Sequence, residues 1–89
     1  MSAPCAAQVF SGVSQQQFNC LVQEAASQGI TINGNQGTTV VKHGLVSAQI
    51  SWNFDATTQT LTLQYLNPTF LAPCDKVNGM LHDLVASCP

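Results

Sequence analysis

"VSAQISWNFDATTQTLTLQYL", residues 46–66, decides the fold, because apolar and polar side chains alternate along most of its length. Alternation with a period of two is typical of a β-strand with one buried face. The apolar set is Val46, Ala48, Ile50, Trp52 and Phe54 before the turn "DATTQ", and Leu61, Leu63 and Tyr65 after it. The stretch therefore predicts an antiparallel hairpin.

The opposite face of this hairpin is polar and uncharged until Asp55. Its residues are Ser47, Gln49, Ser51, Asn53, Thr60, Thr62 and Gln64. Neutral polar groups cost less free energy than ions when they leave water, so such a face can dock on a protein or a glycan without burying charge. A surface that only keeps the protein soluble is the alternative interpretation.

A helix is predicted on the N-terminal side of the hairpin. Ser14 and Gln17 have the spacing of a capping box, and Phe18 begins an apolar stripe with helical period that ends before Gly29. Residues 3–12, "APCAAQVFSG", predict a short helical turn or an irregular segment. Residues 30–43, "ITINGNQGTTVVKH", predict two strands joined by an Asn-Gly turn.

A second helix is predicted over residues 74–88, "CDKVNGMLHDLVASC". Asp75 is the expected N-cap, and Gly79 is a weak point that costs about 1 kcal/mol against alanine. The apolar face consists of Val77, Met80, Leu81, Leu84, Val85 and Cys88. This stripe predicts a helix that packs on the apolar face of the sheet.

These patterns predict one α+β domain over residues 1–89: an N-terminal helix, an antiparallel meander of three to four strands, and a C-terminal helix on the apolar face. A helix followed by a meander resembles the layout of the cystatin-type inhibitors. Their Gln-x-Val-x-Gly loop is absent, since "QGTTVV" from Gln36 does not match it, and the terminal helix is foreign to that pattern. The resemblance is one of architecture and implies no activity.

Cys5, Cys20, Cys74 and Cys88 predict two disulfides. A chain of 89 residues buries about 60 to 65 % of its unfolded surface, so covalent staples are expected. Disulfides indicate an extracellular or periplasmic location, with any signal peptide already removed, because "MSAPCAAQVF" lacks a basic start and an apolar run. The alternative is four reduced, buried cysteines in a cytosolic protein.

The disulfide connectivity depends on the second helix. A continuous helix over residues 74–88 would place its ends about 21 Å apart, too far for one bond. Cys74 and Cys88 would then pair with Cys5 and Cys20. If Gly79 breaks the helix, the local pairs Cys5 with Cys20 and Cys74 with Cys88 become possible. The position of Cys20 off the apolar stripe of its own helix favours a partner in the N-terminal segment. The sequence leaves both alternatives open.

Charge is scarce, with two lysines, four acidic residues and no arginine. The six are Lys42, Lys76, Glu24, Asp55, Asp75 and Asp83. Two isolated lysines cannot neutralise several phosphates, which excludes nucleic acid as a partner. They also cannot form a polybasic membrane-binding patch. No run of 18 apolar residues occurs, so no transmembrane segment is predicted.

Residues suited to catalysis are few. His43 and His82 are the only imidazoles, and Asp83 diverges from His82 by about 100° around a helix. No Gly-x-Ser-x-Gly motif and no Cys-x-x-Cys motif occurs. The sequence therefore predicts neither an enzyme nor a cofactor or metal site. A hydrolase or metal protein that uses His43 and His82 is the distant alternative.

Binding is the function class that remains. The main hypothesis is a non-catalytic interaction protein that contacts a protein or glycan through the polar sheet face or a strand edge. The alternative is a carrier of a small apolar ligand, held where the helices cover the sheet incompletely. The residues expected to line that cavity are Trp52, Phe54, Tyr65, Phe70 and Met80. Ordinary core packing is the competing interpretation for them.

Overall fold

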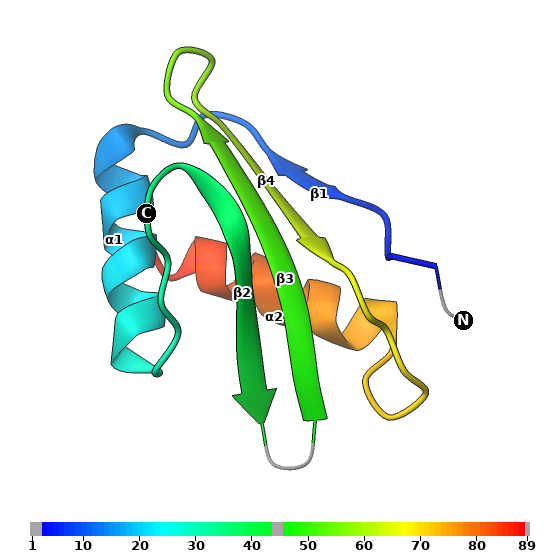
Figure 1. Cartoon of the computed structure of the whole chain (residues 1–89). Coiled ribbons are helices and arrows are strands. Elements are labelled where there is room, and N and C mark those ends of the chain that lie inside the picture. The colour runs from blue at the N-terminus through cyan, green and yellow to red at the C-terminus, as the bar shows by residue number, and fades with distance from the viewer. Residues whose placement is uncertain (1–2, 44–45, 89) are drawn as a thin grey trace.

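A four-stranded antiparallel sheet forms the centre of the structure, a computed structural model that describes residues 3–43 and 46–88 (Figure 1). The strands are β1 (Gln8–Phe10), β2 (Gln36–His43), β3 (Val46–Asp55) and β4 (Thr60–Tyr65), in the order β1-β4-β3-β2. The helices are α1 (Gln15–Ser27) and α2 (Cys74–Ala86). The predicted α+β class is confirmed, with a helix on each side of the β2–β4 meander in the chain.

The predicted hairpin is β3 and β4. Trp52 pairs with Leu63 and Phe54 pairs with Leu61, which places the apolar residues of both strands on one face. The apolar residues of β3 and β4 from Ala48 to Tyr65 are buried. Asp55 Oδ1 accepts hydrogen bonds from the backbone N–H groups of Thr57 and Thr58, at 3.0 and 3.3 Å, and so fixes the turn.

Both helices lie on the apolar side of the sheet. In Figure 1, α2 crosses behind the strands and α1 stands beside its C-terminal end. The capping box of α1 is confirmed: the Ser14 hydroxyl accepts from Gln17 N–H, and the Gln17 side chain accepts from Ser14 N–H. The ring of Phe18 stacks on Phe54 with centroids 4.4 Å apart, which joins α1 to the core of the sheet.

Two disulfides are present, as predicted, and they resolve the connectivity. Cys5 bonds Cys74, and Cys20 bonds Cys88. The helix α2 continues through Gly79, where an added Cβ would meet nothing within 4 Å. Of the two alternatives, the structure shows the continuous helix with pairing between the two ends of the chain. The expectation that Cys20 pairs within the N-terminal segment is wrong. Because of this pairing, α2 is covalently held at both ends.

Three local predictions need correction. Residues 8–10 form β1, paired with β4, although a helical turn or irregular segment was expected. Residues 30–35 form no strand; Ile30 N–H instead donates to Ala25 O at 2.9 Å and closes the end of α1. Asp75 is not the N-cap of α2. The helix is capped at Pro73, and Asp75 lies in its first turn.

Candidate functional site

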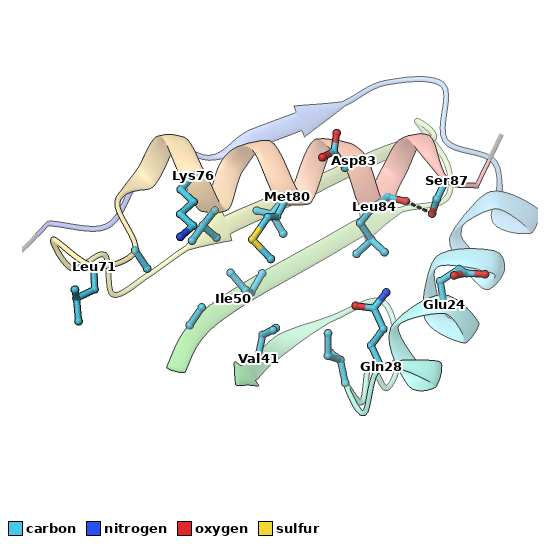
Figure 2. Close-up of a pocket in the computed structure, with 15 residues that line it drawn as sticks. Glu24, Gln28, Val41, Ile50, Leu71, Lys76, Met80, Asp83, Leu84 and Ser87 are labelled. Atoms are coloured by element: carbon cyan, nitrogen blue, oxygen red, sulfur yellow. Dashed lines mark hydrogen bonds between the residues drawn. The ribbon is translucent and has the colours of Figure 1, made fainter. Parts of the chain in front are cut away.

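An apolar groove lies between α2 and the inner face of the sheet (Figure 2). It arises because α2 packs on β4, while the hairpin end of β2 and β3 extends past the helix (Figure 1). The groove has a volume of about 410 Å³, within the range of about 300 to 1,000 Å³ that is typical of small-molecule sites. Its apolar lining is Ile30, Val41, Ala48, Ile50, Leu71, Ala72, Val77, Met80, Leu81 and Leu84.

The groove has a buried floor and an exposed rim. Ala48 and Ile50 from β3, with Val77 and Leu81 from α2, are buried in the core. On the rim, by contrast, Leu71 is 61 % exposed and Met80 is 50 % exposed. Large apolar side chains left in water around a concavity mark a surface that gains stability when a ligand covers it.

The charged and polar groups of the groove are unevenly placed. Lys76 lies on the first turn of α2, at the same end as Leu71 (Figure 2). Glu24 and Asp83 lie toward the opposite end, and in Figure 2 both carboxylates point away from the groove. The groove therefore has a cationic end and a long apolar wall. This polarity gives a ligand a preferred direction.

The residues predicted for an apolar cavity divide into three groups. Met80 lines the groove. Trp52, Phe54 and Tyr65 lie in the core: Trp52 Nε1–H donates to Gly34 O at 3.2 Å, and the Tyr65 hydroxyl donates to Ala72 O at 3.0 Å. Phe70 is 91 % exposed, in the loop before α2. Of the five, the structure therefore brings only Met80 to the groove.

Sequence reasoning missed Leu71, Lys76, Leu84 and Val41 as lining residues. One signal was available, because the apolar stripe of α2 is wide. Val77 and Leu81 face the core, while Met80 and Leu84 form a second row along the groove. A helix that needed only one contact surface would carry a narrower stripe.

The predicted polar face exists as one surface. Strand register places Ser51 beside Gln64 and Asn53 beside Thr62, with Ser47, Gln49 and Thr60 on the same side. No helix covers this face in Figure 1, where it is turned toward the viewer. By strand register, the same face also carries Thr38, Val40 and Lys42 from β2 and Val9 from β1. Apart from Lys42 and Asp55 near its ends, the face is uncharged.

The outer edge of β2 is a second candidate surface. Phe54 N–H donates to Asn35 O, and Leu66 N–H donates to Gln49 O, which fixes the direction of the alternating backbone groups. It follows that the backbone N–H and C=O groups of Thr38 and Val40 point away from β3. Both residues are exposed, so an eight-residue strand edge is open to pairing.

The two histidines lie at opposite edges of the sheet. His82 Nε2 lies 2.9 Å from Gln8 Oε1, and the ring packs against Phe10 with centroids 4.8 Å apart, so His82 is held at β1. His43 ends β2, the opposite edge strand, and its side chain lies outside the described residues. Within residues 3–43 and 46–88, no three His, Cys, Asp or Glu side chains are grouped to hold a metal ion.

Neither helix in the described part of the chain is long and apolar enough to cross a membrane. No protein-family model, curated protein or solved structure matches this chain.

Proposed function

We propose that this protein binds and carries a small apolar ligand in the groove beneath α2, outside the reducing cytoplasm. The observation that carries the proposal is the groove itself, which is concave and apolar, has a volume of about 410 Å³, and has Met80 and Leu71 exposed on its rim. None of the residues that line the groove comes from the polar sheet face. For that reason the carrier ranks above the docking surface favoured by the sequence.

The rigidity of the groove supports this proposal. Its main walls are α2 and the strands β2 and β3, with loop residues Leu71 and Ala72 at one end, and disulfides hold α2 at both ends. A preformed site loses little conformational entropy when it binds, so more of the apolar burial appears as affinity. The same disulfides support a location in the extracellular space or a periplasm, where such bonds persist.

A neutral fluorescent probe, N-phenyl-1-naphthylamine, tests the groove. We expect stoichiometric binding, and we expect Met80→Gln to raise its Kd about five- to tenfold, because an amide replaces an apolar wall group. Val40→Gln is the matched control: Val40 is 49 % exposed, close to the 50 % of Met80, but lies on the opposite face of the sheet. Fluorescence titration measures both constants.

The proposal fails if the probe does not bind the wild-type protein. It also fails if Val40→Gln weakens binding as much as Met80→Gln, because the probe would then occupy a surface other than the groove. Circular dichroism of each variant shows whether the fold is kept.

The open edge of β2 favours a second candidate function, the docking of a partner chain as an added strand. Val40→Pro removes an outward N–H without breaking a bond to β3, because proline is tolerated on the free side of an edge strand. Val9→Pro, at the opposite edge β1, is the control. We expect a partner recovered stoichiometrically from the native fluid to lose most of its binding to Val40→Pro and to keep it with Val9→Pro. Equal recovery by both variants, or no recovery by the wild type, would contradict edge docking.

A further inference from the structure

We propose that the ligand of the groove is an anionic amphiphile, a single acyl chain whose carboxylate lies at Lys76 and whose tail lies along α2. This inference rests on the proposed function of the groove. It adds the chemical class of the ligand and the direction in which it binds.

The charge of the chain is distributed in a way that singles out Lys76. The protein has two cationic residues besides its histidines, Lys42 and Lys76. Lys42 pairs with Ser47 and therefore lies on the polar face, on the far side of the sheet from the groove. Lys76 is the groove's one cation among the described residues. An anionic head is the complement of this end of the site.

The start of α2 adds to the positive potential at the same place. The helix begins at Cys74, and its N-cap Pro73 makes no side-chain hydrogen bond to the first turn. The unsatisfied N–H groups of a helix N-terminus carry a partial positive charge that favours anions. The carboxylate of Asp75, in the same turn, opposes this potential, and it does not line the groove. The assignment of the head group therefore rests on Lys76, which does line the groove.

The apolar wall sets where the tail lies. Met80 and Leu84 follow Lys76 along α2, and in Figure 2 the side chain of Met80 points toward Ile50 on the sheet while that of Leu84 points down into the groove. From Lys76 to Leu84 the helix rises about 12 Å, which suits an acyl tail of medium length. The carboxylates of Glu24 and Asp83 point away from this path (Figure 2). A tail in this position covers the exposed part of Met80.

The test is displacement of the neutral probe by three ligands of equal length: decanoate, 1-decanol and decylammonium, all below their micelle concentrations. Lys76 is exposed, so its ion pair is partly screened. We therefore expect decanoate to bind about two- to fivefold tighter than decanol, and decylammonium to bind weakest. Raising the salt concentration should narrow the gap. Lengthening the acid from octanoate should tighten binding about two- to fourfold per methylene.

Two substitutions assign the effect to one residue. Lys76→Gln should abolish the preference for decanoate over decanol, and Lys76→Glu should reverse it in favour of decylammonium. Lys42→Gln, which removes the same charge from the opposite face, should leave the preference unchanged.

The outcomes separate the inference from the function on which it rests. If decanoate and decanol bind the wild type equally, or if Lys42→Gln reduces the preference as much as Lys76→Gln, the head-group assignment is wrong and the groove remains a neutral apolar site. If neither the probe nor any ligand binds, the proposed function itself fails.

Discussion

Replacing Cys20 and Cys88 by alanine is expected to lower the free energy of unfolding by about 4 kcal/mol. With the Cys5–Cys74 bond kept, this bond closes a loop that runs through residues 5–20 and 74–88, and the chain-entropy model gives about 3.6 kcal/mol for a loop of about 29 residues. Small domains have a total stability of about 5 to 15 kcal/mol. Urea denaturation should therefore show a folded but marginal protein, and reduction of both bonds should unfold it.

The second disulfide is the internal control for this result. With the Cys20–Cys88 bond kept, the Cys5–Cys74 bond closes the same loop of residues 5–20 and 74–88, so its entropic contribution is the same. We expect the double alanine variants of the two pairs to agree within about 1 kcal/mol. A loss of less than about 1 kcal/mol of unfolding free energy for either pair would contradict the chain-entropy model.

Protein from its native source, kept free of reductant, should weigh four hydrogens less than the reduced formula. A fully reduced mass would overturn the proposed location.

Substitution of Gly37 by valine is expected to cost about 2 to 3 kcal/mol, because there is no room for a side chain at this position. A Cβ would lie 2.8 Å from Cη2 and 3.0 Å from Cζ2 of Trp52. The indole is buried and held by its hydrogen bond to Gly34, so it cannot move aside at low cost. The backbone φ of Gly37 is 156°, an angle that residues with a Cβ rarely adopt.

Thr38→Val is the matched control, because Thr38 is the next residue of β2 and is exposed on the opposite face. We expect its effect to stay within about 0.5 kcal/mol. Urea titrations followed by the fluorescence of Trp52, the sole tryptophan, measure both variants. Equal stability of Gly37→Val and the wild type would show that the indole has room to shift.

Local periodicity explains which parts of the fold could be predicted. The β3–β4 hairpin and both helices are long enough for their apolar spacing to identify them. The three residues of β1 are too short to show a period, and they become a strand because they pair with β4. Ile30 and Ile32 alternate as in a strand, but they lie in an irregular segment, from which Ile32 packs against the core and Ile30 lines the groove. Tertiary contacts decided both cases.

The groove could not be predicted from the sequence in the same way. An apolar stripe shows that a helix is buried on one side, but it does not show how far the helix reaches across a sheet. That reach depends on where α2 is anchored, and the disulfides to Cys5 and Cys20 set those anchors. The flexible side chain of Met80 suits a ligand site, so the sequence indicates this residue. Lys76 is, in the sequence, only one of two isolated cations.

The overlap of the two disulfides also determines how the protein bears mechanical load. A pull applied outside Cys5 and Cys88 passes through the sulfur atoms to Cys74 and Cys20, so it is shared by residues 5–20 and residues 74–88. The chain between Cys20 and Cys74, which contains β2, β3 and β4, stays slack. The distance between Cys5 and Cys88 then cannot exceed about 50 Å, whereas it could reach about 300 Å in the same chain without crosslinks. Force can strip away β1 and straighten α2, yet it has no direct path to the three-stranded meander.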